Sequence, residues 1–120
     1  MQIGRLAKLA GITTSRIRFY EANGIIAPAA RAANGYRDYD AKTADLLRFI
    51  VQSQDLGFSL DEIRDAVRLK RNHRLRHADV LAALQRKLSA VEEHIAANRK
   101  LRSNIRKMIA VVEADKALRD

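Results

Sequence analysis

The spacing of apolar residues along the chain changes character near position 58. Before it, apolar stripes are short and interrupted, whereas after it one apolar pattern continues almost to the end. All five glycines and the single proline, Pro28, lie before position 58. Because glycine and proline are the strongest breakers of helices, the pattern predicts several short elements followed by one long helix.

Two short helices are predicted first. Apolar residues at positions 3, 6, 7 and 10 form one helical stripe, and Gly11 is suited to end that helix. Thr13 is a good N-cap for a second helix, which should continue to Asn23 and stop at Gly24. Two helices separated by about three residues, one of them glycine, have the spacing of a helix-turn-helix.

A small hairpin should follow, which we call the wing (residues 31–40). An extended segment, residues 25–28, leads into it, and Asn34-Gly35 stands between short polar and aromatic arms. Asn-Gly predicts a type I′ turn, in which both residues have positive φ.

Two more helices are predicted before the long one. Asp40 can cap a helix that ends at Gly57, and Ser59 with Glu62 forms a capping box for the next. A basic run at 68–77 then holds five Lys or Arg, two His and no acid. It is either a solvated linker or an auxiliary contact to phosphate.

The long helix should run from Asp79 to about Val112, roughly 50 Å at 1.5 Å per residue. Its apolar residues step by three and four in two runs, with a slip of register at Asn98. Four small helices cannot cover such a length, so we expect a homodimer, antiparallel or parallel. The expected dimerisation residues are Leu81, Leu84, Leu88, Val91, Ile95, Leu101, Ile105, Met108 and Val112.

Composition narrows the possible functions. The 120 residues carry a net charge of +9, which favours an anionic partner, nucleic acid first. Cysteine is absent, so disulfides and thiolate metal sites are excluded, and we expect no metal and no cofactor. His73 and His77 lie in basic surroundings that repel a cation. No apolar run is long enough to span a membrane and no signal peptide is recognisable, which predicts a cytoplasmic protein.

Four stretches, IGRLAKLAGI, RIRFYEANGII, NGYRDY and DLGFSLDEI, occur in an order and spacing that resemble the MerR family of bacterial transcription regulators. The later RHADV, before the long helix, resembles the copper- and metal-responsive branch. The resemblance implies a mainly α fold: a winged helix-turn-helix domain (1–70), a basic linker (71–78) and an antiparallel dimerisation helix with a short tail (79–120). It also implies binding to an inverted repeat in double-stranded promoter DNA, with distortion of the spacer for RNA polymerase.

Candidate DNA contacts lie on the second helix and the wing. The N-terminal end of a helix favours phosphate, and arginine can pair with guanine. The resemblance favours Arg18 as the shared contact and assigns contacts with the DNA backbone to Arg37 and the wing tyrosines. Alternation along the arm means that one tyrosine should be core. The candidates are Thr13, Thr14, Ser15, Arg16, Arg18, Tyr20, Arg31, Tyr36, Arg37 and Tyr39.

Two functions stay open at this point. The first is a dimeric DNA-binding regulator, and the second is a basic coiled-coil interaction protein without sequence-specific regulation. We expect no enzyme, because no phosphate loop, nucleophile elbow or metal-ligand spacing is present.

In the metal-sensing branch that the sequence resembles, thiolates near the end of the dimer helix hold the metal ion. In this chain the corresponding residues are Ala110 to Glu113, and none of them is a cysteine.

Overall fold

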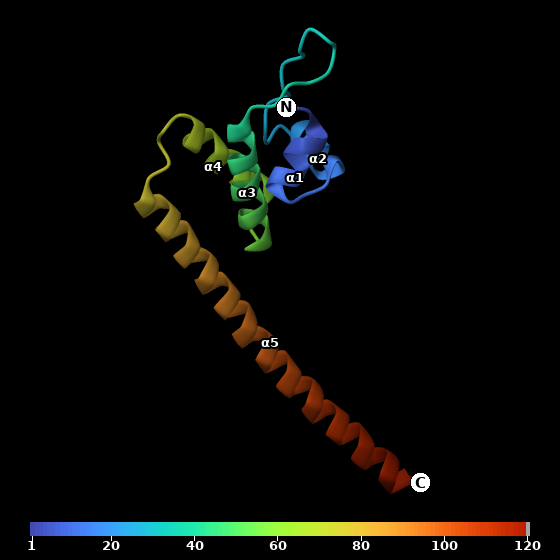
Figure 1. Cartoon of the computed structure of the whole chain (residues 1–120). Coiled ribbons are helices and arrows are strands. Elements are labelled where there is room, and N and C mark those ends of the chain that lie inside the picture. Colours follow the sequence, from blue (N-terminus) through green and yellow to red (C-terminus); the bar gives the residue numbers. More distant parts are fainter. Residues whose placement is uncertain (120) are drawn as a thin grey trace. The chain divides into compact units, whose positions relative to one another are not determined.

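The computed structural model describes the backbone of residues 1–119 and the side chains of residues 1–116. Its helices are α1 (Ile3–Ala10), α2 (Thr14–Ala22), α3 (Ala41–Asp55), α4 (Leu60–Arg71) and α5 (His77–Arg119) (Figure 1). They form two compact units, Met1–Arg76 and His77–Asp120. The fold is mainly helical, as the sequence predicts. Among the described residues, no helix is both long and apolar enough to cross a membrane.

The first unit has one hydrophobic core. Helix α1 packs against α2 and α3, and α3 packs against α4. The apolar stripes predicted for these helices point into this core, with Val51 and Leu60 at its edge. Its fully buried aliphatic side chains are Leu6, Ile17, Ile25, Ile26, Leu47, Ile50, Ile63 and Val67.

The starts of the helices follow the predicted caps. The hydroxyl of Thr13 accepts a hydrogen bond from the Arg16 amide, and the Asp40 carboxylate accepts one from the Lys42 amide. Ser59 and Glu62 form the complete capping box at the start of α4. Each cap satisfies a backbone donor that has no partner inside the helix. The turn between α1 and α2 is therefore determined by local sequence.

The first four helices end in the same backbone geometry. Gly11, Gly24 and Gly57 follow α1, α2 and α3 with φ of 72°, 69° and 86°, the left-handed region that glycine adopts without strain. His73 takes this position after α4, with φ of 54°. Its amide donates to the carbonyl of Lys70, and the next amide donates to that of Leu69. His73, whose side chain has a Cβ, therefore stands in the left-handed conformation after α4, which glycine adopts more easily.

The wing is a hairpin held by few backbone bonds. Arg31 and Arg37 form an isolated antiparallel bridge, and the Ala32 amide donates to the carbonyl of Tyr36. Gly35 has φ of 83°, but Asn34 has no positive φ, so the type I′ prediction is wrong. The Gly35 amide instead donates to the Ala32 carbonyl, which gives a three-residue loop with glycine in the left-handed region. The loop extends beyond the helices of its own unit (Figure 1).

The helix bounds around the basic run differ from the prediction. Helix α4 continues to Arg71 and α5 begins at His77, so the loop between them covers only 72–76. The breaker-free sequence carries α5 to Arg119, beyond the predicted end near Val112. At 1.5 Å per residue its 43 residues span about 64 Å.

Candidate nucleic-acid interface

A hollow of about 680 Å³ lies between α2 and the wing. Cationic side chains predominate among its charged groups, because Arg18, Arg31 and Arg37 all line it and Glu21 is the one acidic residue. The other lining residues are Gln2, Ile3, Ala22, Pro28, Gly35, Tyr36 and Tyr39. An open surface with several guanidinium groups suits a polyanion.

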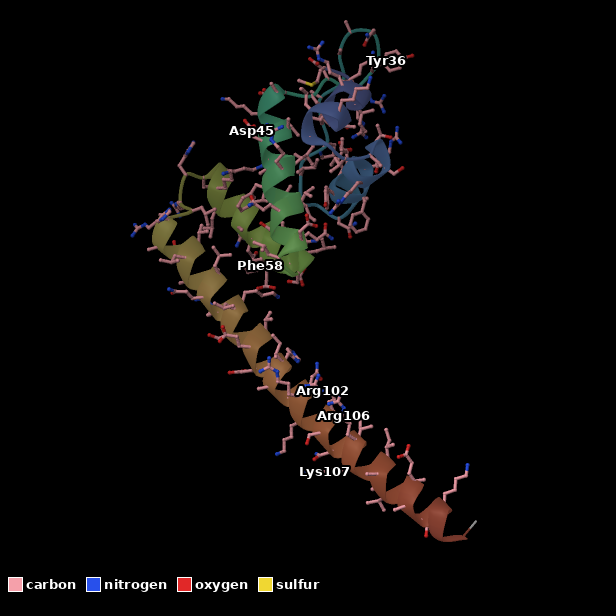
Figure 2. The ribbon with its side chains drawn as sticks, turned by 60° about the horizontal axis from the view of Figure 1, so that its bottom comes forward. Tyr36, Asp45, Phe58, Arg102, Arg106 and Lys107 are labelled. Atoms are coloured by element: carbon pink, nitrogen blue, oxygen red, sulfur yellow. The ribbon has the colours of Figure 1, made fainter. Side chains whose placement is uncertain are left out.

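Two of these side chains are free to contact a ligand. The side chains of Arg18 and Tyr36 make no hydrogen bond or ion pair with any residue that the structure describes. Tyr36 is 63% exposed and projects from the wing (Figure 2). Arg31 donates one hydrogen bond, from Nη1 to the Gly35 carbonyl at 2.9 Å, which holds its stem along the wing loop. The guanidinium and phenol groups therefore keep donors for phosphate oxygens.

Arg37 is paired with an acid on α2. Its Nη1 lies 2.7 Å from Oε2 of Glu21, and the Tyr39 hydroxyl donates to the other carboxylate oxygen. The Glu21 side chain is only 9% exposed, whereas that of Arg37 is 40% exposed. Burial raises the pKa of Tyr39, and the hydrogen bond to the Glu21 carboxylate raises it further. We call Glu21, Arg37 and Tyr39 the Glu21 cluster.

Arg16 is held against α3. Its Nε donates to the Tyr20 hydroxyl at 2.8 Å, and its Nη2 donates to Oε1 of Gln54 at 3.0 Å. The Tyr20 hydroxyl also donates to Oε1 of Gln54, at 2.6 Å. Arg16 therefore faces α3, whereas Arg18 lines the hollow beside the wing. Their separation of about 200° around the helix predicts these opposite orientations. Only the remaining donors of Arg16 can contact a ligand.

Burial corrects two of the predicted DNA contacts. Tyr20 is 0% exposed and Tyr39 is 5% exposed, so neither side chain can contact DNA directly. Their rings fill the core, and their hydroxyl groups hold charged neighbours in place. Alternation along the wing arm predicts one core tyrosine, and in the structure that residue is Tyr39, whereas Tyr36 is exposed.

The remaining candidates surround the start of α2. Thr13 and Ser15 are exposed, and Thr14, the first residue of the helix, is half-buried. Sequence reasoning missed Glu21 and Gln54, which position the arginines. Glu21 stands inside the RIRFYEANGII stretch, whereas nothing in the sequence marks Gln54.

Two arginines from other helices cap the helix-turn-helix. Arg48 of α3 donates to the Leu9 carbonyl at 2.6 Å, near the end of α1. Arg64 of α4 donates to the Asn23 carbonyl at the end of α2, from Nε at 3.2 Å and Nη2 at 2.6 Å. A cation at a helix C-terminus satisfies free carbonyls and interacts favourably with the helix dipole. Helix α2 is thereby held at its end as well as along its buried face.

Helix α5 presents an uncovered apolar face. All nine predicted dimerisation residues are exposed in the single chain, and Ile109 and Val111 are exposed too. Ile109 allows a second heptad assignment beside the predicted one with its slip, because 81, 88, 95, 102 and 109 repeat every seven residues. The second series is 84, 91, 98, 105 and 112. In this second assignment one register runs through the helix, with Asn98 and Arg102 as its polar positions.

The fold and this surface define a winged helix-turn-helix protein. Comparison with family models assigns it further: the description "MerR HTH family regulatory protein" matches residues 1–70, and "MerR, DNA binding" matches residues 44–108. The chain belongs to the MerR family of helix-turn-helix regulatory proteins and is a DNA-binding transcription regulator.

Individual relatives agree with this assignment. The HTH-type transcriptional regulator CueR of Yersinia pestis is 41% identical over 95 residues, which cover 79% of this chain and 68% of that protein. The HTH-type transcriptional regulator PA4778 of Pseudomonas aeruginosa is 35% identical over 115 residues, which cover 96% of this chain and 87% of that protein. The transcription regulator PbrR691 of Ralstonia metallidurans, whose structure was solved with lead(II), matches with a TM-score of 0.75 at 30% identity. The match covers 88% of this chain and 82% of that protein.

The donor set of this chain does not fit a soft metal ion. Lead and copper prefer thiolate ligands, and the sequence has no cysteine. Within the described residues, no three His, Asp or Glu side chains come together as a metal site. Lead(II) is named for that relative, and we carry no metal over from it to this chain.

Proposed function

We propose that this regulator binds an inverted repeat in promoter DNA as a homodimer, with α2 in the major groove and the wing on the flanking phosphates. The observation that carries the proposal is the hollow between α2 and the wing, where Arg18, Arg31 and Arg37 line one surface beside the exposed Tyr36. We assign DNA binding to residues 1–70, the connection to 71–78 and dimerisation to 79–120.

Charge along α5 favours an antiparallel dimer. In a parallel pair, Arg102 of one copy would face Arg102 of the other inside the seam, which places two like charges together. An antiparallel pair centred on the Leu81–Val112 stretch brings Arg102 opposite Val91 and Asn98 opposite Ile95 of the second copy. It also brings Glu92 beside Arg99 of the second copy, an attractive pair.

The proposed action on transcription follows from the dimer. An antiparallel helix pair sets a fixed distance between two copies of α2, so each reads one half-site, one helical turn or a multiple of it apart. Deformation of the spacer between the half-sites would bring the promoter elements into the arrangement that RNA polymerase recognises. We place this activity in the cytoplasm and assign the chain no enzymatic activity and no cofactor.

A salt titration tests DNA binding and separates it from the alternative, a basic coiled-coil interaction protein. A dimer that makes ~8 phosphate contacts should show a slope near −7 when the logarithm of affinity is plotted against the logarithm of salt concentration. The measurement uses fluorescence anisotropy with duplex DNA. A slope shallower than about −2 would show that the basic hollow does not face DNA.

A further inference from the structure

The Glu21 cluster joins α2 and the second arm of the wing, two elements of the proposed DNA-binding surface. The wing has one isolated backbone bridge, so its own hydrogen bonds hold it weakly. Both oxygens of Glu21, on the last turn of α2, receive hydrogen bonds from the second arm of the wing, one from Arg37 and one from Tyr39. Met1 also binds this arm, at Asp38 and at the backbone of Tyr39, so the carboxylate is the part of the wing's anchorage that comes from α2.

The charge of Glu21 is unfavourable for DNA binding by itself. It is the one acidic residue lining a surface that also holds Arg18, Arg31 and Arg37. A carboxylate at that place repels phosphate and neutralises part of the charge of Arg37. Its presence is understandable if its positional effect outweighs this electrostatic cost.

We propose that Glu21 is a positioning residue that holds the wing in the geometry needed for phosphate contact, through its bonds to Arg37 and Tyr39. The expected loss of DNA affinity rests on the proposed function, whereas the effect of Glu21 on the position of the wing does not. Arg37 thereby has two tasks: Nη1 holds the wing, and its other donors remain available to DNA.

The sign of a mutational effect separates positioning from charge. Glu21→Gln keeps the shape of the side chain and removes its charge, so electrostatics alone predicts tighter DNA binding. Positioning predicts weaker binding to operator and scrambled duplexes alike. The expected weakening is about tenfold, the size of one lost charge-assisted hydrogen bond. Asp55→Asn is the matched control, because it removes an exposed acid of the same unit and should not weaken binding.

A double-variant cycle tests whether Glu21 acts through Arg37. If it does, the effects of Glu21→Gln and Arg37→Ala should be less than additive, because Arg37→Ala already removes one of the two bonds that the Glu21 carboxylate accepts. Additive weakening would overturn this route. Circular dichroism and thermal unfolding verify that each variant is folded. Tyr39→Phe removes the other hydrogen bond and replaces Glu21→Gln if that variant fails to fold.

Wing order in the absence of DNA provides an independent measurement. Glu21→Gln should speed amide hydrogen exchange at Ala32 and Asp38, the two wing amides that donate across the hairpin, and leave α3 amides unchanged. The Tyr39 pKa, followed by tyrosine NMR, should fall as the carboxylate is lost. Unchanged exchange at both amides would overturn the inference. Failure of the wild-type chain to bind any DNA would instead contradict the proposed function.

Discussion

Arg64 should contribute to stability through α2 rather than through its ion pair. The change is Arg64→Met, which keeps an unbranched stem and removes the guanidinium. That group donates to the Asn23 carbonyl at 3.2 and 2.6 Å and to Asp61 at 2.7 Å. Asp61 is 90% exposed, so that pair contributes little.

The magnitude follows from these contacts. Hydrogen bonds to charged groups contribute about 1.5–3 kcal/mol, and the 41% exposure of Arg64 favours the lower end. We therefore expect Arg64→Met to reduce the free energy of unfolding by about 1.5 kcal/mol. Arg68→Met is the matched control, because the one polar partner of the Arg68 side chain among the described residues is the exposed Asp65, at 3.4 Å. Its cost should stay below about 0.5 kcal/mol.

The assay is urea unfolding at one protomer concentration, since dimerisation makes apparent stability depend on concentration. The difference between the two variants decides the outcome. An equal cost for both, or a cost of Arg64→Met below about 0.5 kcal/mol, would refute the reasoning that Arg64 caps α2.

Three further predictions concern DNA reading, assembly and backbone strain. Arg18→Ala should reduce discrimination between operator and scrambled DNA by about 1–3 kcal/mol in paired titrations, whereas equal weakening on both would assign Arg18 to phosphate. The pair Leu84→Arg and Leu88→Arg should give monomers in sedimentation, an expectation that fails if the unaltered chain is already monomeric at micromolar concentration. His73→Gly should raise the free energy of unfolding by about 0.5–1 kcal/mol in urea titrations, because it removes left-handed strain, and a loss of stability would contradict this.

Local sequence determined the features that could be predicted well. Thr13, Asp40 and Ser59 cap helices within a few residues of themselves, and Gly11 and Gly24 end helices for the same local reason. Such effects depend on neighbours in the chain, so a sequence is enough to identify them. The order and spacing of the helices in the helix-turn-helix could therefore be predicted from these capping residues and glycines.

Contacts between distant residues could not be predicted in the same way. Gln54 meets Arg16 across 38 positions, and no periodicity or motif marks that pair. Tyr20 and Tyr39 are typical of an interface by residue type, yet packing buries them and leaves only their hydroxyl groups for bonding. Which tyrosine faces solvent depends on tertiary packing rather than on propensity.

Selection of DNA from a random pool tests the central claim most directly. The full chain is incubated with random-sequence duplexes at physiological salt, and the retained DNA is sequenced. Sequence-specific binding by a two-fold symmetric dimer predicts an enriched inverted repeat, with half-sites one helical turn or a multiple of it apart. Enrichment of no motif, or of a single half-site without symmetry, would contradict the claim that this chain reads DNA as a homodimer.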